Sequence, residues 1–156
     1  MIEEQIPGFG PLSMQHLVLD LNGTLTVGGR WLDGVPERIE RLAEVLSVHV
    51  LTADTYGVAR ELTRGLPLGL TVLAAGGEDR QKAEYVARLG PEGCVAVGNG
   101  RNDVGMLSLA RLAIVVIEAE GCAAAALRVA DVVCRSGPEA LDLLLCPERL
   151  RATLRS

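Results

Sequence analysis

Four polar groups in this 156-residue sequence carry the side chains that phosphoryl transfer requires. Asp20 begins Asp-Leu-Asn-Gly-Thr-Leu-Thr, Thr52 lies in Leu-Thr-Ala-Asp, Lys82 stands alone, and Asp103 ends Gly-Asn-Gly-Arg-Asn-Asp. The chemistry needs one group that attacks phosphorus, donors that hold the phosphate oxygens, and a divalent cation that bridges carboxylate and phosphate. A carboxylate, a hydroxyl, an ammonium and a second carboxylate form a suitable set for this reaction.

Each group also has a purely structural interpretation when it is taken alone. Asp20 could end a strand, Thr52 could cap a helix, and Gly98-Asn99-Gly100 could form a turn. Residue counts favour the chemical interpretation. Of the 15 basic residues only Lys82 is a lysine. A lysine ammonium is a compact point charge, whereas an arginine guanidinium is a planar fork, so the two bind anions differently. The three asparagines all lie within these groups, at positions 22, 99 and 102.

The elements expected to position these groups alternate along the chain. Apolar runs typical of buried strands occupy 17–21, 48–52, 68–73, 94–97, 112–117 and 131–134. Helical periodicity occupies 36–46, 57–65, 79–89, 102–110, 121–129 and 138–146. This order predicts an α/β fold, a three-layer, doubly wound, Rossmann-like parallel sheet with helices on both faces. The polar groups then converge on one crevice at the carboxyl edge of the sheet.

Two segments interrupt this alternation. Residues 24–32 contain Gly28-Gly29 between short β-prone runs, which predicts a hairpin above the carboxyl edge. Trp31 is interpreted as the hydrophobic anchor of this hairpin or as a contact for substrate or a partner. Residues 1–14, rich in Pro and Gly, are interpreted as an irregular lead-in or a short edge element. We expect residues 15–156 to form a single domain.

Composition narrows the partners and the compartment. The net charge of −5 argues against nucleic acid or an anionic membrane surface, because both favour dense basic patches. The four Cys show no zinc-ligand spacing. The N-terminus is acidic and no apolar run reaches the ~18 residues that span a bilayer. We therefore expect a cytoplasmic protein.

Other phosphate-binding folds fit these residues less well. Residues 98–103 lack the third glycine of a dinucleotide fingerprint, and they follow the fourth strand rather than the first. No segment matches a nucleotide P-loop. A two-component receiver domain also uses Asp, Thr and Lys, but it has an acidic pair at its first strand and no hairpin there.

The four groups resemble the motifs of the haloacid dehalogenase superfamily, and most closely those of the phosphorylation domain of P-type ATPases. Asp20 to Thr26 is similar to Asp-Lys-Thr-Gly-Thr-Leu-Thr, residues 51–54 to Leu-Thr-Gly-Asp, and residues 97–103 to Val-Gly-Asp-Gly-x-Asn-Asp. Ala-Asp-Val-Val at 130–133 also resembles a segment of those pumps. The resemblance covers about 15–146 and includes Lys82, and the order of the motifs makes it specific for the superfamily.

The resemblance implies a role for each matched residue. Asp20 would be the nucleophile that forms an aspartyl-phosphate, and Asp54 would help organise the site. The hairpin would be a mobile flap. The implied catalytic residues are Asp20, Asn22, Thr52 and Lys82. The implied phosphate site is formed by Asn22, Gly23, Thr52, Ala53, Lys82 and Asn102. The implied Mg²⁺ site is formed by Asp20, the backbone carbonyl of Asn22, Asn99 and Asp103.

Two positions depart from the superfamily's phosphatases, which usually have Asp where this chain has Asn22 and Asn99. An amide at position 22 cannot transfer the proton that the leaving group needs, and losing a general acid or base typically costs about 10²–10⁴ in rate. An amide at position 99 gives Mg²⁺ a neutral oxygen where a carboxylate is preferred.

The spacing of the motifs leaves no room for a cap domain. Between Leu25 and Thr52 there is space for the hairpin, one helix and one strand, and between Thr52 and Lys82 for a helix and a strand. An uncapped site favours a large substrate or a neighbouring subunit that covers it, so a homo-oligomer is one expectation.

Two functions follow from these observations. The first is a Mg²⁺-dependent phosphohydrolase whose hydrolysis is slow because Asn22 replaces the general acid/base. The second is a weak or inactive relative that binds phosphate or a phosphoprotein in a regulatory role. The expected partner is a phosphorylated small molecule or a phosphoprotein.

Overall fold

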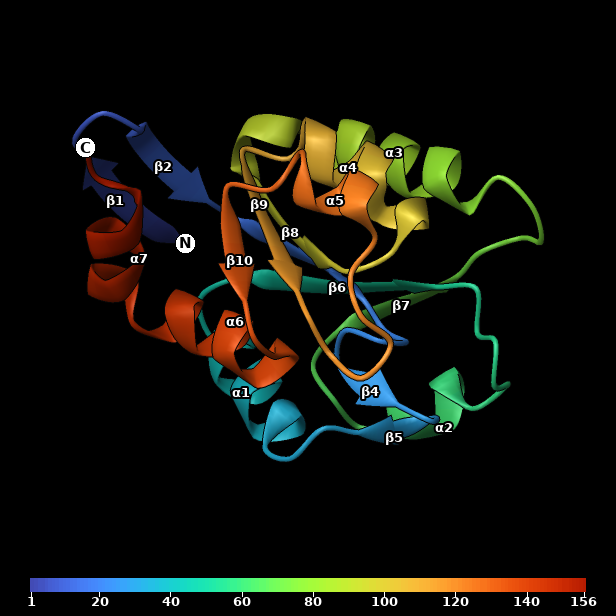
Figure 1. Cartoon of the computed structure of the whole chain (residues 1–156). Coiled ribbons are helices and arrows are strands. Elements are labelled where there is room, and N and C mark those ends of the chain that lie inside the picture. The colour runs from blue at the N-terminus through green and yellow to red at the C-terminus, as the bar shows by residue number, and fades with distance from the viewer.

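The computed structural model describes residues 1–156 and shows a three-layer α/β fold (Figure 1). The central sheet contains six parallel strands in the order β10-β9-β8-β3-β6-β7. Their bounds are β3 His16–Asp20, β6 Ser47–Thr52, β7 Gly69–Val72, β8 Cys94–Gly98, β9 Leu112–Val116 and β10 Val132–Cys134. The predicted fold class, without a cap domain, is confirmed.

Helices cover both faces of this sheet (Figure 1). One face carries α1 (Val35–Ala43) and α6 (Gly137–Leu145), and the other carries α3 (Glu78–Leu89), α4 (Val104–Leu109) and α5 (Ala124–Leu127). Two short 3₁₀ turns, η1 (Pro91–Gly93) and η2 (Arg101–Asp103), flank β8. No helix combines the length and the apolar content that a membrane crossing requires.

The central strands divide their side chains between two cores. In β8, Val95 and Val97 pack on the α1 and α6 face, whereas Cys94 and Ala96 pack on the α3 and α4 face. Successive residues of a strand point to opposite faces, so a continuous apolar run buries both. In β8 the side chains toward α3 and α4 are the smaller ones.

Helix α3 is mostly polar, and its buried residues are Lys82 and Val86. They are four residues apart and therefore share one face of the helix. The helix thus carries one ammonium into the interior, next to the end of β3.

The predicted hairpin at 24–32 is present as β4 (Thr26–Val27) paired with β5 (Arg30–Trp31). Gly28 and Gly29 connect the strands with φ of 58° and 74°, the left-handed conformation that tight hairpin turns need. Trp31 packs against the larger core, and its Nε1 donates a hydrogen bond to the Leu62 carbonyl at 3.2 Å. The interpretation of Trp31 as the anchor of the hairpin is confirmed.

The structure corrects the prediction for residues 1–14. β1 (Ile2–Ile6) and β2 (Gly10–Met14) pair antiparallel with each other as a separate hairpin and do not join the central sheet. Their buried side chains, such as Leu12 and Met14, belong to the larger core. A further helix, α7 (Pro147–Leu154), packs against β1, and Arg151 forms a 3.0 Å ion pair with Glu4.

Two helices are shorter than the sequence predicts. Residues 57–65 contain only α2 (Ala59–Leu62), between Gly57 and Gly65, which both have positive φ. Residues 121–129 contain only α5, because Gly121 has a φ of 76° and Ala123 is extended. The chain before each helix instead forms a loop at the carboxyl edge of the sheet.

Candidate active site

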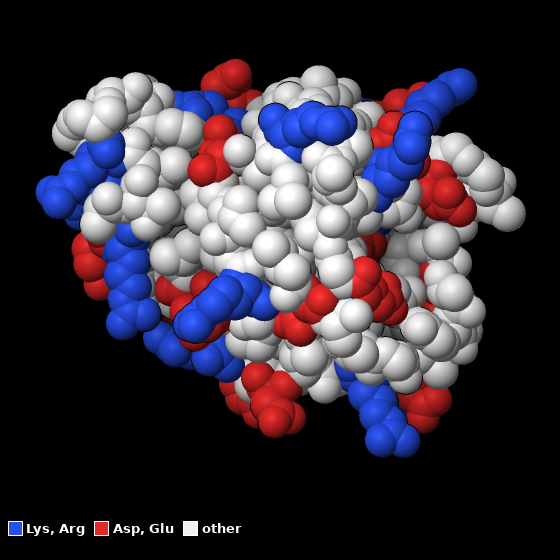
Figure 2. Space-filling view, viewed as in Figure 1, with Lys and Arg blue, Asp and Glu red and all other residues white.

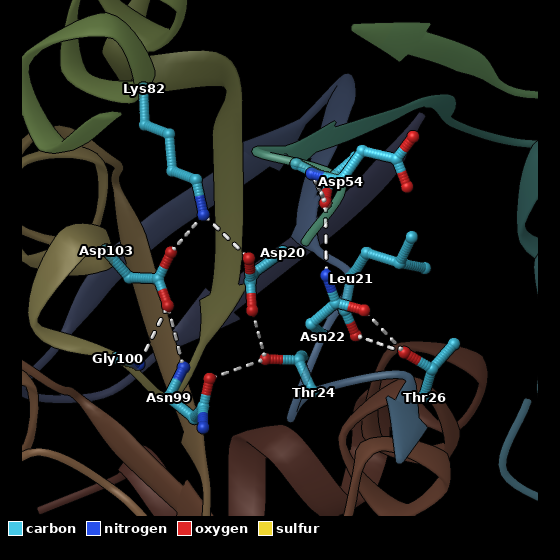
Figure 3. A network of polar contacts seen from close by, with 11 residues as sticks. Asp20, Leu21, Asn22, Thr24, Thr26, Asp54, Lys82, Asn99, Gly100 and Asp103 are labelled. Atoms are coloured by element: carbon cyan, nitrogen blue, oxygen red, sulfur yellow. Dashed lines mark hydrogen bonds and ion pairs between the residues drawn. The ribbon is translucent and has the colours of Figure 1, made fainter. Parts of the chain in front are cut away.

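The predicted polar groups meet at the carboxyl edge of the sheet (Figure 3). Asp20 ends β3 and Thr52 ends β6, its neighbour, while Asn99 follows β8 on the other side. Lys82 reaches the same place from α3. The side chains of these four residues are buried although they are polar, so the partners that satisfy them define the site.

Lys82 lies between two carboxylates. Its Nζ is 2.6 Å from Asp20 Oδ1 and 2.7 Å from Asp103 Oδ1. Burial lowers the pKa of Lys82, but the charges of both carboxylates outweigh it and shift that pKa upward. Lys82 is therefore an ammonium at neutral pH, and it holds one oxygen of each acid in place.

Asp20 has a second partner on its other oxygen. Oδ2 accepts a 2.9 Å hydrogen bond from the Thr24 hydroxyl. Burial and the neighbouring Asp103 charge raise the pKa of Asp20 to about 6, against the opposite effect of Lys82 and Thr24. The carboxylate is thus oriented from both sides, and it is ionised for the most part at neutral pH.

Asp103 has no free oxygen in this arrangement. Oδ1 contacts Lys82, and Oδ2 accepts hydrogen bonds from the backbone N–H groups of Asn99 and Gly100 at 2.9 and 2.8 Å. Asp103 is fully buried. Asp103, which the resemblance implies as a metal ligand, therefore holds Lys82 and the loop after β8 in this structure.

Asn99 links three segments of the site. Its Oδ1 lies 3.2 Å from the Thr24 hydroxyl oxygen, whose single proton is shared between Asn99 and Asp20, and its Nδ2 donates to the Gly121 carbonyl at 3.1 Å. Since the carbonyl requires a donor, the amide oxygen must face Thr24 and Asp20. Position 99 therefore presents a neutral oxygen beside Asp20.

Asn22 is held by two threonines. Its Oδ1 accepts a 3.3 Å hydrogen bond from Thr26, and its Nδ2 lies 3.5 Å from Thr52 Oγ1 as a donor. The Thr52 hydroxyl also accepts from the backbone N–H of Asp54 at 2.9 Å. With these donors directed at its oxygen, Thr52 keeps its own proton available for a phosphate oxygen.

Asp54 shapes the loop that follows Thr52. It is the only residue other than glycine with a positive φ, 53°, and its carboxylate accepts a hydrogen bond from the Ala59 N–H at 2.9 Å. This conformation is tolerated by Asp because its short side chain can bond locally. Asp54 thus holds the loop rather than the reacting groups.

An open cavity of about 510 Å³ lies over these groups. Of the sequence-predicted residues, it is lined by Asp20, Asn22, Thr52, Ala53, Asn99 and Asn102. Lys82 and Asp103 lie beneath it. Gly23 also lies outside the lining, and its N–H donates to the Thr26 carbonyl at 2.8 Å, so that group is not free to hold phosphate here.

Sequence reasoning missed two parts of the site. Thr24 bridges Asp20 and Asn99, and its place within the first motif was a usable signal. Residues 120–123 line the cavity from the loop after β9. Because β9 is a neighbour of β8 in a parallel sheet, the residues after it belong to the same edge.

The oxygens beside Asp20 suit a hard divalent cation. Asp20 provides a carboxylate and Asn99 an amide oxygen, both next to the Thr24 hydroxyl, and Mg²⁺ takes oxygen ligands. No three side chains of His, Cys, Asp or Glu gather into a metal-binding group. These oxygens suit a divalent cation, but only one of the two side chains is a carboxylate. Mg²⁺ binding should therefore be weaker than at a site with two carboxylates.

Comparisons with known proteins identify the fold. No protein-family model matches the chain. Two uncharacterized proteins of Methanocaldococcus jannaschii are each 44% identical to it, one over 61 residues, or 39% of this chain and 66% of that protein, and the other over 39 residues, or 25% and 89%.

Solved structures match over most of the chain. The 3-deoxy-D-manno-octulosonate 8-phosphate phosphatase from Yersinia pestis is 16% identical, covers 98% of this chain and 95% of its own, and has a TM-score of 0.62. The corresponding enzyme of Moraxella catarrhalis, in complex with magnesium and phosphate ions, is 15% identical with coverages of 92% and 94% and a TM-score of 0.63. A haloacid dehalogenase-like hydrolase from Streptococcus pneumoniae is 12% identical with coverages of 85% and 99% and a TM-score of 0.63. The chain therefore has the fold that haloacid dehalogenase-like phosphatases share.

Proposed function

We propose that this chain is a phosphohydrolase that transfers a phosphoryl group to Asp20 and then to water. The observation that carries the proposal is the Asp20 carboxylate, held by Lys82 on one oxygen and Thr24 on the other, at the floor of an open polar cavity. An oriented, desolvated carboxylate with an ammonium and hydroxyl donors around it is the arrangement that aspartyl-phosphate chemistry needs.

In the first step the phosphoryl group is transferred to Asp20, and each site residue has a separate role. A carboxylate oxygen of Asp20 attacks phosphorus, the new O–P bond forms, and the bond from phosphorus to the leaving oxygen breaks. The leaving oxygen keeps the electron pair of that bond and takes its proton from water in the open cavity, because the Asn22 amide cannot supply one. The Thr52 hydroxyl, the free N–H of Ala53 and Lys82 donate toward the phosphoryl oxygens. Mg²⁺ bound beside Asp20 and Asn99 would supply positive charge to the phosphate. Asp103 keeps Lys82 in position.

The second step lacks a proton carrier at the usual position. Asn22 is fixed by Thr26 and Thr52 beside the cavity, and an amide neither gives nor takes a proton at neutral pH. The P-type ATPases, whose motifs this chain resembles, also lack a carboxylate there. We therefore propose that the phosphoenzyme is long-lived and that its hydrolysis limits turnover.

Replacing Asn22 by Asp is expected to accelerate phosphoenzyme hydrolysis about 10²-fold, the lower end of the range for a positioned general acid/base. The Thr26 hydroxyl, which donates to Asn22 Oδ1, can orient the new carboxylate in the same way. Single-turnover decay of the phosphoenzyme measures this rate, and Asn102→Asp is a matched control that adds a charge to the same cavity. A decay rate that stays the same or falls in Asn22→Asp would contradict the mechanism.

The pH dependence follows from the raised pKa of Asp20, about 6. Only the ionised carboxylate attacks phosphorus, so the rate of phosphoenzyme formation should fall as the pH drops through this value. A bound cation favours the ionised form, so the midpoint should move to lower pH as Mg²⁺ is raised from subsaturating to saturating. Equal rates on both sides of pH 6 at low Mg²⁺ would count against this assignment.

A regulatory phosphate-binding role is the second candidate, and the amides at 22 and 99 favour it. The two candidates differ in turnover: the regulatory protein would bind phosphate without Mg²⁺-dependent hydrolysis of an aryl phosphate. Under either, the open cavity suits a phosphorylated small molecule or the side chain of a phosphoprotein.

A further inference from the structure

The cavity has two acidic lining residues, Asp20 and Glu120. They differ in what surrounds them. Asp20 is paired with Lys82, and a third acid nearby, Asp103, has both oxygens engaged. Glu120 has no hydrogen-bond or ion-pair partner in the protein, and it is exposed to the cavity solvent. Glu120 is therefore the uncommitted carboxylate of the site.

Glu120 lies directly against the segment that follows Asp20. A methyl group added at Gly23 would collide with Glu120 Oε2 and would lie 2.7 Å from Asn99 Nδ2. The two side chains thus meet over Gly23, whose φ of 78° and missing Cβ make room for them. The Asn99 atom on this side is Nδ2, so the Glu120 carboxylate approaches the nitrogen end of the Asn99 amide, beside Gly23.

The backbone on both sides of Glu120 is held by hydrogen bonds. Gly121 closes a tight turn by donating its N–H to the Glu118 carbonyl at 2.7 Å, and the Glu118 carboxylate accepts the Gly137 N–H at 3.0 Å. Asn99 holds the other side, through its Nδ2 to the Gly121 carbonyl at 3.1 Å and its own carbonyl to the Ala123 N–H at 2.8 Å. Glu118 and Glu120 therefore point in different directions from one fixed loop. In Figure 2 acidic side chains lie over this loop, between β9 and α5.

This loop explains why an amide can stand at position 99. An aspartate there could not donate to the Gly121 carbonyl, and its charge would lie beside that of Glu120. The Asn99 amide instead donates a hydrogen bond to the Gly121 carbonyl, and Glu120 is the residue next to Gly121 in this loop. The loop after β9 thus carries a carboxylate, Glu120, beside the Asn99 amide.

We propose that Glu120 provides the second anionic group of the cation site formed at Asp20 and Asn99. The inference rests on the proposed function only in assuming that this site holds a divalent cation. Oxygen ligands and a carboxylate charge suit Mg²⁺, and loss of a group that supports a metal site typically lowers metal affinity 10–100-fold.

The test is calorimetric titration of the metal-free full chain with MgCl₂, without any phosphate ester. Glu120→Gln should weaken Mg²⁺ binding by about 10–100-fold, and Asp20→Asn should weaken it as well. Glu118→Gln is the matched control, since it removes the same charge from the same loop and its amide oxygen can still accept the Gly137 N–H. Its Mg²⁺ affinity should equal that of the wild type.

Three results would overturn the inference: wild-type affinity in Glu120→Gln, equal losses in both Glu variants, or no measurable Mg²⁺ binding by the wild type. Phosphoenzyme formation, measured separately, tests the proposed function. Turnover with Mg²⁺ binding unaffected by Glu120→Gln would refute only the inference. Glu120-dependent binding without any phosphoenzyme would refute only the proposed function.

Discussion

Asp20→Asn should lower phosphoryl transfer by at least about 10⁴-fold, because an amide oxygen cannot replace the attacking carboxylate. The variant should fold, since the new amide oxygen can still accept a hydrogen bond from Lys82. Acid-stable incorporation of phosphate and Mg²⁺-dependent hydrolysis of an aryl phosphate both measure the effect.

Asp33→Asn is a suitable control for this experiment. Asp33 is exposed in the loop between β5 and α1, so its replacement should leave both measurements unchanged. Mg²⁺-dependent turnover that survives in Asp20→Asn would show that another group attacks phosphorus. Absence of any turnover in the wild type, with phosphate still bound, would favour the regulatory candidate.

Lys82→Met is expected to lower the free energy of unfolding by about 3–5 kcal/mol, the usual effect of removing one partner from a buried ion pair. Lys82 is fully buried and its ammonium lies between Asp20 and Asp103. Without it, two carboxylates remain in a space that disfavours their charges. Urea unfolding at neutral pH measures the loss.

The pH dependence of this loss separates electrostatics from packing. At low pH Asp20, whose pKa is raised to about 6, takes up a proton and no longer leaves an unpaired charge in the variant, so the stability difference between Lys82→Met and the wild type should narrow. Arg80→Met is the matched control, because Arg80 lies on the same helix with an exposed side chain and should change stability little. A deficit in Lys82→Met that is equal at neutral and acidic pH would point to lost packing alone.

The motif-bearing part of the fold could be predicted from the sequence because β3, β6 and β8 are short apolar runs that each lead into a polar residue. Asp20, Thr52 and Asn99 follow such runs, and a parallel sheet brings those ends together. Lys82 was predictable for another reason, because it is the only lysine of the chain.

The N-terminal hairpin and α7 could not be predicted in the same way. Between Ile2 and Ile6 the residues are Glu-Glu-Gln, which gives no apolar run, and the prolines and glycines that follow are typical of a loop. The hairpin buries its few apolar side chains against α7 and the main core, so it depends on contacts between distant segments. Its period-two pattern at Leu12 and Met14 was the available signal.

The detailed roles at the site also depended on the structure. Asp103 Oδ2 accepts hydrogen bonds within the turn of residues 98–103 and Oδ1 contacts Lys82 from α3, and the motif alone predicts neither contact. The approach of Glu120 to Gly23 results from the backbone bonds at Glu118 and Gly121. Such contacts arise from loop geometry, which residue types alone do not specify.

The position of β3 in the middle of the sheet ties the site to the order in which the chain folds. Its two neighbours, β6 and β8, come from later and well-separated parts of the sequence, and parallel pairings between distant segments form slowly because loop closure costs entropy first. Asp20 therefore meets Lys82 and Asp103 only after β3 has paired with β8 and α3 has packed against them. A chain without these contacts would carry the proposed nucleophile without the groups proposed to hold phosphate. On the proposed function, phosphorylation of Asp20 would accordingly report that β3, β8 and α3 have reached their native arrangement.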